Sequence, residues 1–465
     1  MLPPTNATHW LTLHGLVTLL AVLVYVVSSH AMHQRRPPAS AIAWMLFIVL
    51  LPYLALPAYL VFGSRKLARP SGARAALPAG ADRPDRWAVD TILALGQPAP
   101  TTCEDLHLHA DGQAARDALF RVIEGAQERI DICTFILGND TPGPEVVARL
   151  AAKARQGVRV RLLLDGLGSL MQRPVSLAPL TAAGGQVQRF VPPLHSPLKG
   201  RTNLRNHRKM LIADAGLPAA RLWCGGRNLA AEYFTGAAGK PAWRDLSFDV
   251  GTGLVQQAAN LFARDWAFAS GQAAPAGLGE PAVRVVPQGG AQLVASGPDQ
   301  ADDTVLALLV MAAYRARGRI ALATPYFVPD PSLLMALSLA ARRGVVVDLL
   351  VPARSNHRLS DLARGRGLRA LAQAGGRIWM TQDMMHAKLA VFDEVLALAG
   401  SANLDSRSLL LNYELMCAFH GQDDVRRFGD WFEHERQRAR PWAAKPPGLA
   451  RDLAEGMLLW LGFQL

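Results

Sequence analysis

The apolar residues of the chain are distributed unevenly, with two long uncharged runs near the N-terminus. Residues 10–28 and 41–62 contain no Lys, Arg, Asp or Glu, and neither run shows an amphipathic stripe. Each run is long enough to cross a hydrocarbon core of roughly 30 Å, and the prolines of the second, Pro52 and Pro57, are tolerated in such helices. We therefore expect residues 1–66 to form a two-helix transmembrane hairpin.

A cleaved signal peptide is the alternative for the first run. Ser29-His30-Ala31 resembles a cleavage site, but no Lys or Arg precedes Trp10 and a second apolar run follows closely. The flanking basic residues predict the orientation, because they are enriched on the cytoplasmic side. The larger cluster follows the second run, which favours a cytoplasmic body with the N-terminal tail on the same side. These residues are Arg65, Lys66, Arg69 and Arg74, against Arg35 and Arg36 in the loop.

Beyond this segment, helical patterns alternate with short apolar runs, and the order occurs twice. Such alternation is typical of an α/β layer structure. In the first half, residues 117–129 and 145–156 are helical, and 130–137 and 158–164 are strand-like. In the second half, residues 304–317 and 332–343 are helical, and 319–327 and 345–351 are strand-like.

An internal duplication explains this order. The segment ARQGVRVRLLLDG at 154–166 matches ARRGVVVDLLVPA at 341–353. We expect two homologous α/β sandwich domains, residues 67–275 and 276–448, packed about a pseudo-twofold axis that brings equivalent loops together. The pattern of apolar and charged residues in 449–465 predicts a C-terminal helix. This helix either lies at a membrane interface or docks on the body.

Each half contains one copy of the pattern H-x-K-x4-D. The copies are His207, Lys209 and Asp214, and His386, Lys388 and Asp393. Side chains two residues apart on a strand share a face, so each His and its Lys point toward one site. Two copies at equivalent places in a duplication are not expected by chance.

Two histidines and two lysines in one site suit a phosphodiester anion. One neutral His can attack phosphorus while the other, protonated, gives a proton to the leaving alkoxide. The lysines would neutralise the non-bridging oxygens, with hydrogen bonds from Asn228, Ser401 and Asn403. The alternatives are histidines satisfied within the core, or a metal site, which the cationic lysines and the lack of further close ligands argue against.

Each histidine also needs a partner that fixes its tautomer. Asn412-Tyr413-Glu414 aligns with Trp243-Arg244-Asp245, so we expect Glu414 and Asp245 to be the orienting carboxylates. Asp214 and Asp393 end their strands, and this position favours a structural role in which each ties a loop to a backbone amide.

Composition refines this picture in three respects. A net charge of +12 favours an anionic partner, either nucleic acid or an acidic lipid surface. Lysine is scarce, seven against forty-two arginines, so two lysines in equivalent motif positions stand out. The four cysteines are far apart and form no C-x-x-C pair, which excludes a sequence-local zinc finger.

The duplicated motif resembles that of the phospholipase D superfamily, and the wider chain resembles its bacterial cardiolipin synthases. Further matches are the N-terminal runs, NLRNHRKMLIAD, TPYFVPD at 324–330, and HAKLAVFD followed by GSANLDSRS. The resemblance implies phosphatidyl transfer between two phosphatidylglycerol molecules, with release of glycerol, a phosphatidyl-histidine intermediate and no metal or other cofactor. It also implies that both H-K-D sets are catalytic, that His207 is the nucleophile, and that the protein is embedded in the bacterial inner membrane.

Other functions remain open at this level. A lipid hydrolase of the same superfamily would share the intermediate and use water as acceptor. A membrane-tethered nuclease also acts on a phosphodiester, but no basic stripe with interleaved aromatic residues is visible, so we expect no nucleic-acid partner. A non-catalytic membrane-binding module is disfavoured by two intact motifs. Two departures from the family pattern are Gly226 in place of the serine found at 401, and Phe135 in place of a tyrosine.

Overall fold

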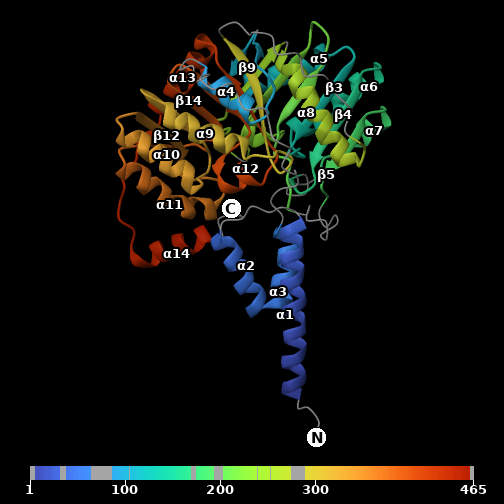
Figure 1. The fold of residues 1–465 in the computed structure, drawn as a ribbon. Helices are drawn as coiled ribbons and strands as arrows, with labels where there is room; N and C mark the ends of the chain where they lie inside the picture. Colours follow the sequence, from blue (N-terminus) through green and yellow to red (C-terminus); the bar gives the residue numbers. More distant parts are fainter. Residues whose placement is uncertain are drawn as a thin grey trace.

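The computed structural model has an α/β body from which a helical N-terminal segment projects (Figure 1). The structure describes residues 6–31, 38–63, 86–103, 105–168, 174–192, 203–237, 239–251, 253–273 and 289–460. The flanking basic residues used to predict the orientation lie outside the described residues.

The first half of the body is built on a seven-stranded sheet in the order β2-β8-β7-β6-β3-β4-β5. The two helices that the alternation predicted, α5 (Gly112–Gly125) and α6 (Pro142–Arg155), cover one face with apolar side chains, and α8 (Gly253–Ser270) lies on the other. The strands are β2 (His107–His109), β3 (Arg129–Thr134), β4 (Arg159–Asp165), β5 (Gln186–Phe190), β6 (Met210–Ala213), β7 (Arg221–Gly225) and β8 (Ser247–Gly251). The helices are α5 (Gly112–Gly125), α6 (Pro142–Arg155), α7 (Ala178–Ala182) and α8 (Gly253–Ser270), with a short 3-10 turn at Ala231–Tyr233.

The second half has a nine-stranded sheet in the order β1-β9-β17-β15-β14-β10-β12-β13-β18. Its principal strands are β9 (Gly290–Ser296), β10 (Arg319–Ala323), β12 (Val346–Pro352), β13 (Arg377–Thr381), β14 (Leu389–Phe392), β15 (Leu396–Gly400) and β17 (Glu414–Phe419). The short strands are β1 (Thr101–Thr102), β11 (Phe327–Val328), β16 (Leu404–Asp405) and β18 (Arg440–Pro441). The helices are α9 (Thr304–Arg315), α10 (Pro331–Arg342), α11 (Arg358–Gln373), α12 (Ser406–Leu410) and α13 (Gln422–Gln437).

The two sheets have the same strand order. The run β8-β7-β6-β3-β4-β5 corresponds to β17-β15-β14-β10-β12-β13, and β2 corresponds to β9. In the first sheet, β6 follows the motif and pairs antiparallel with β3, which pairs parallel with β4. In the second sheet, β14 pairs antiparallel with β10, which pairs parallel with β12. The duplication read from the sequence is therefore a duplication of topology.

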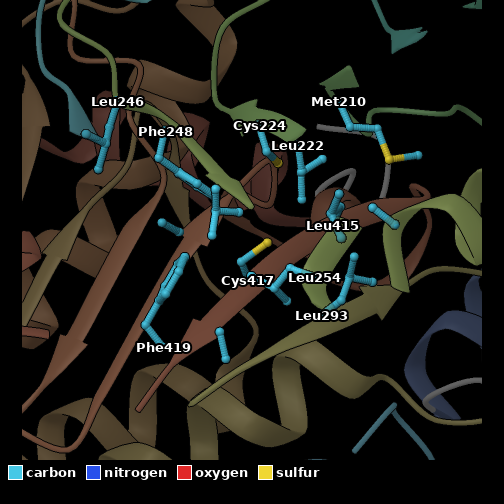
Figure 2. Close-up of a cluster of buried hydrophobic side chains, with 14 of the residues drawn as sticks. Met210, Leu222, Cys224, Leu246, Phe248, Leu254, Leu293, Leu415, Cys417 and Phe419 are labelled. Atoms are coloured by element: carbon cyan, nitrogen blue, oxygen red, sulfur yellow. The ribbon is translucent and has the colours of Figure 1, made fainter. Parts of the chain in front are cut away.

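The two halves share one hydrophobic core. Side chains from β7 and β8 of the first sheet, including Cys224 and Phe248, meet Leu415, Cys417 and Phe419 from β17 of the second (Figure 2). Burial of this much apolar surface between the sheets favours a fixed relative position of the halves. The segment before the first repeat adds to the connection, because α4 (Trp87–Ala94) packs on α9 and β1 pairs with β9 of the second half.

The N-terminal segment differs from the expected pair of helices. Residues 6–31 form one helix, α1 (Asn6–Ala31), but the second apolar run is divided at Leu51 into α2 (Pro38–Leu50) and α3 (Pro52–Phe62). Proline lacks an amide hydrogen and disfavours a helical residue before it, and Leu51 has a non-helical φ of −138° and ψ of 60°.

Helices α2 and α3 fold back on each other beside α1. The Tyr25 hydroxyl of α1 donates to the Ala41 carbonyl near the start of α2, and Ser28 of α1 contacts the Tyr59 hydroxyl near the end of α3 at 2.7 Å. The chain therefore enters and leaves the α2–α3 pair at the same end of α1, whereas a second crossing would have carried it to the other end. Within the described residues, no helix combines the length and the apolar character needed to cross a membrane.

The C-terminal helix α14 (Leu449–Trp460) is docked on α11 through charged side chains. Glu455 is fully buried and pairs with Arg369 at 2.5 Å, and Arg366 pairs with Asp452 at 3.1 Å. Three apolar side chains at four-residue spacing remain exposed on the same helix: Leu449, Leu453 and Met457. Helix α14 lies at the edge of the body from which α1–α3 project (Figure 1).

Candidate active site

The two H-x-K motifs lie where the two sheets meet, each directly before a central strand. His207 and Lys209 precede β6, and His386 and Lys388 precede β14. Short backbone bridges join these segments to the opposite half: the His207 amide donates to the Tyr413 carbonyl at 2.9 Å, and the His386 amide donates to the Arg244 carbonyl at 2.7 Å. The pseudo-symmetric contacts bring both motifs into one site.

The orienting carboxylates are exchanged between the halves. His207 Nδ1 donates to Glu414 of the second half at 3.0 Å, and His386 Nδ1 donates to Asp245 of the first half at 2.7 Å. Both carboxylates are fully buried. Because Nδ1 carries the proton in each pair, Nε2 of each ring is left with its lone pair for chemistry.

The two lysines are buried within the same cluster. In each half the lysine ammonium donates to the backbone carbonyl of the histidine two residues earlier, Lys209 to His207 at 2.7 Å and Lys388 to His386. Lys388 Nζ also lies 3.0 Å from His386 Nε2. Two ammonium groups beside two imidazole rings form a site for an anion.

Burial controls the protonation of these groups. It lowers the pKa of Lys388 to about 7 and that of Lys209 to about 8. Burial, together with the charge of Lys388, lowers the pKa of His386 to about 3, and burial also lowers the pKa of His207. Burial alone would raise the pKa of Asp245, but the neighbouring His386 and Lys388 outweigh it and hold that pKa at about 2. These shifts favour neutral imidazoles beside ionised carboxylates.

The aspartates of the motif lie away from this cluster, at the far ends of β6 and β14. Asp214 accepts hydrogen bonds from the backbone amides of residues 127–129 at 2.7–2.9 Å, and Asp393 accepts those of residues 317–319 at 2.7–3.0 Å. Both have a positive φ of 50°. Both aspartates therefore lie apart from the histidines and lysines that the resemblance grouped with them, at the strand ends where the sequence placed them.

The predicted phosphate ligands are largely engaged elsewhere. The Ser401 hydroxyl donates to Glu414 at 2.5 Å and accepts from the Leu415 amide, so it supports the carboxylate rather than a substrate. The Asn228 side chain donates to the Tyr233 hydroxyl at 2.7 Å and accepts from the Ile136 amide at 3.3 Å. Asn403 differs, because its Oδ1 atom is buried and has no hydrogen-bond partner among the described residues.

Gly226 replaces serine for a steric reason. A Cβ atom at this position would lie 2.2 Å from Oδ1 of Asp245, which is a severe clash. The shorter aspartate side chain brings its carboxylate close to the backbone at 226, whereas the longer Glu414 leaves room for the Ser401 hydroxyl. The two half-sites therefore use matched pairs, Asp with Gly and Glu with Ser.

Several supporting residues were not singled out from the sequence. Arg208 and Arg227 are fully buried, and each binds the backbone carbonyl of an orienting carboxylate residue: Arg208 that of Glu414 at 3.1 Å, Arg227 that of Asp245 at 2.6 Å. Their position inside the motifs NHRK and GGRN was the available signal. Aromatic rings also enclose the histidines, with Phe135 against His207 and both Tyr233 and Trp243 against His386.

Chemically, the arrangement offers two imidazole Nε2 atoms and two ammonium groups in one buried cluster. Nucleophilic attack on phosphorus, proton transfer to a leaving oxygen and charge stabilisation can all be supplied by these side chains. Among the described residues, no group of three or more His, Cys, Asp or Glu side chains is arranged to hold a metal ion.

Comparisons with known proteins agree over most of the chain. A family model described as "Cardiolipin synthase, PLD-like domain" matches residues 119–266 and again 309–436, and a "Phospholipase_D-nuclease N-terminal" model matches residues 17–64. Cardiolipin synthase A of Pseudomonas putida (strain W619) is 32% identical over 426 residues, which is 86% of each chain. Cardiolipin synthase 1 of Bacillus anthracis is 30% identical over 468 residues, covering 92% of this chain and 90% of the relative.

Solved structures confirm the fold at lower identity. The phosphatidylserine synthase of Haemophilus influenzae Rd KW20 aligns with a TM-score of 0.64 and 12% identity, over 81% of this chain and all of that chain. The double match to one family model agrees with the duplicated sheets, and the identity to the curated relatives extends over nearly the full length. The chain belongs to the cardiolipin synthases of the phospholipase D superfamily.

Proposed function

We propose that the protein transfers a phosphatidyl group from one phosphatidylglycerol to the hydroxyl of a second, giving cardiolipin and glycerol. The observation that carries this proposal is the pair of crosswise histidine–carboxylate contacts, with both lysines buried beside them. An anionic phosphodiester placed among these groups meets two cations and two imidazoles held in the reactive tautomer. The comparisons support the same reaction, because the relatives named above are cardiolipin synthases.

The reaction divides into two displacements at phosphorus. In the first, Nε2 of one neutral histidine forms a bond to phosphorus, the bond from phosphorus to the glycerol oxygen breaks, and the other histidine, as imidazolium, donates its proton to that oxygen. In the second displacement, the histidine that acted as the acid is now neutral, and it takes the proton of the acceptor hydroxyl. The acceptor oxygen then bonds to phosphorus, the phosphorus–nitrogen bond breaks and cardiolipin is released.

Lys209 and Lys388 bind the non-bridging oxygens throughout both steps. Each lysine ammonium donates a hydrogen bond to the backbone carbonyl of the histidine two residues earlier. Because this contact already holds the lysine in place, little reorganisation is needed when the phosphate enters. The negative charge of the substrate favours the cationic form of both lysines and of the acid histidine, and so offsets the lowering of their pKa values by burial. The substrate itself thus helps to set the protonation state that the first step needs.

The enzyme works at the surface of the bacterial inner membrane, where α1–α3 anchor it and the body faces the cytoplasm. The side chains Leu16, Leu19 and Leu23 on α1 are all more than half exposed, and Leu453 and Met457 on α14 are exposed as well. Apolar side chains exposed in this number fit a lipid environment better than water. A reporter fused after Leu465 should be active as a cytoplasmic fusion, and activity only in the periplasm would contradict this orientation.

The test of the reaction uses purified full-length protein and labelled phosphatidylglycerol, with EDTA present. Cardiolipin and glycerol in equal amounts are expected. Phosphatidic acid as the sole product would instead establish a hydrolase, and the absence of any lipid product would reject a lipid substrate. His207→Ala and His386→Ala should each lower turnover by a factor of about a thousand or more, because each removes a group that acts in both displacements.

A further inference from the structure

The duplicated site is not symmetric in its polar surroundings. Beside His207 lies a set of five polar residues, which we call the arginine side: Asn203, Arg205, Asn403, Arg407 and Asn412. At the equivalent positions beside His386, the alignment of the two halves places Gln382, Met384, Asn228, Glu232 and Trp243. Two arginines are thus replaced by a methionine and a glutamate across the pseudo-twofold axis, while the histidines and lysines are retained.

The arginine side is continuous with the His207 half-site. Asn203 and Arg205 lie in the segment just before His207, and the Arg205 carbonyl accepts a hydrogen bond from the Tyr413 amide at 2.9 Å. Arg407 donates to the carbonyl and Oδ1 of Asn203 at 3.2 and 3.1 Å. Next to Arg407 in α12, the Ser408 hydroxyl donates to Glu414, which is the partner of His207.

Polar atoms on this side are buried without partners. Asn203 Nδ2, Asn403 Oδ1 and Asn412 Oδ1 have no hydrogen-bond partner among the described residues. At the equivalent position across the axis, both ends of the Asn228 amide are hydrogen-bonded. Buried unpaired polar atoms are costly and rare, so a group of them beside a catalytic histidine points to a ligand that supplies both acceptors and donors.

The acidic residues nearby are occupied by backbone amides. Asp165 accepts from the amides of Leu167, Gly168 and Asn206 at 2.8–2.9 Å, and Asp405 caps α12 through the Ser408 amide at 2.7 Å. Burial raises the pKa of both aspartates to about 6. Burial and the charge of Arg205 lower the pKa of Arg407, as expected for two guanidinium groups held close together.

We propose that the arginine side is the acceptor subsite, which binds the glycerophosphate headgroup of the second anionic lipid. The phosphate of this headgroup accepts hydrogen bonds from the side chains of Arg205, Arg407 and Asn203. Its glycerol hydroxyls donate to the side-chain amide oxygens of Asn403 and Asn412. The lysines are already committed to the phosphate that is transferred, so the second phosphate needs cations of its own. This inference rests on the proposed transfer reaction and names the groups that select a lipid acceptor over water.

The position of this subsite assigns the two histidines. In an in-line displacement the incoming and leaving oxygens lie on the side of phosphorus opposite the nucleophile. The acceptor lies beside His207, so His207 acts as acid and base and His386 carries the phosphatidyl group. The resemblance to the family implied the reverse assignment, and the asymmetry between the half-sites is the reason for the change.

The experiment compares two acceptors with the same donor and the same full-length enzyme in mixed micelles. One assay measures cardiolipin formation, in which the acceptor is phosphatidylglycerol. The other measures exchange of labelled glycerol into phosphatidylglycerol, in which the acceptor has no phosphate. Arg407→Gln and Arg205→Gln should raise the KM for cardiolipin formation about tenfold or more, because each removes a charged donor to the acceptor phosphate, and should leave glycerol exchange within about twofold.

Controls separate this inference from folding and from the reaction itself. Arg426→Gln removes one exposed charge on α13 and should change neither assay, and Arg407→Lys should recover part of the lost affinity. Free glycerol 3-phosphate should inhibit cardiolipin formation in the wild type, and less in Arg407→Gln. If it inhibits both equally, the anion binds elsewhere.

Two further results would overturn the proposal. Equal loss of both assays in a variant that melts at the wild-type temperature would make the arginines structural supports of the site. A phosphatidyl adduct found by mass spectrometry on His207 rather than His386 would place the acceptor on the other side. If the wild type yields neither cardiolipin nor exchanged glycerol, the proposed reaction itself fails.

Discussion

The two half-sites contain the same reacting groups but hold them differently. His207 contacts Glu414, whose carboxylate also accepts from the hydroxyls of Ser401 and Ser408. His386 contacts Asp245, which accepts from its own neighbouring amide at Leu246 and lies against Gly226. One carboxylate is therefore fixed by side chains and the other by close backbone packing. The duplication preserved the position of the carboxylate oxygens while the residues that fix them diverged.

The exchange of carboxylates is the strongest feature to test. Glu414→Gln and Asp245→Asn should each lower kcat by a factor of about 10²–10⁴, because the histidine loses the acceptor that fixes its tautomer. The ¹⁵N chemical shifts of selectively labelled histidines should respond crosswise, His207 to the change at 414 and His386 to the change at 245. A response of each histidine to the carboxylate of its own half would contradict the geometry.

The matched pairs Asp–Gly and Glu–Ser predict unequal effects of reciprocal substitutions. Gly226→Ser should lower kcat by at least about tenfold, because the new Cβ displaces the Asp245 carboxylate. Ser401→Gly should cost less, since Ser408 and Asn412 still contact Glu414. Steady-state kinetics of both variants and of the double variant Gly226→Ser with Asp245→Glu would measure the coupling, and additive effects in the double variant would argue against a matched pair.

The pKa values of the two lysines predict the pH range in which activity falls on the alkaline side of the pH profile (the alkaline limb). Their cationic form binds the phosphate, and burial lowers the pKa of Lys388 to about 7 and that of Lys209 to about 8. As pH rises through these values the lysines lose their charge, so kcat/KM should fall severalfold between about pH 7 and pH 9. In kcat the limb should move to higher pH, because bound phosphate raises both pKa values. Lys388→Arg should shift the limb upward, and an unchanged limb would assign it to another group.

The smallest expected effect concerns the motif aspartates. Asp214→Asn and Asp393→Asn should each lower the free energy of unfolding by about 1–3 kcal/mol, because each weakens hydrogen bonds to three backbone amides. Asparagine tolerates the positive φ, so the change isolates the charge. Thermal unfolding should shift while kcat per folded molecule stays close to wild type. A large loss of kcat in a stable variant would return these residues to the catalytic set.

Local patterns in the sequence were sufficient for the elements and for most of the site. The alternation of apolar and polar residues depends on neighbours in the chain, and the helices and strands it predicted within 117–164 and 304–351 occur in the structure. The contacts of Asp214 and Asp393 with backbone amides were also predictable, because they depend on the position of each residue at the end of its strand. The second apolar run was misread as one helix, since hydropathy does not record the bend that Pro52 imposes at Leu51.

The sequence by itself determined the duplication, the pair of H-x-K motifs, the two carboxylates and the anionic character of the substrate, because each is written in residue type and spacing. Only the tertiary structure decided that each carboxylate serves the histidine of the other half, and that Arg205 and Arg407 come together on one side of the site. The physical reason is that these contacts cross the shared core between the sheets, over separations as large as 207 residues between His207 and Glu414. No local pattern specifies which of two equivalent partners will be nearest once the halves have packed.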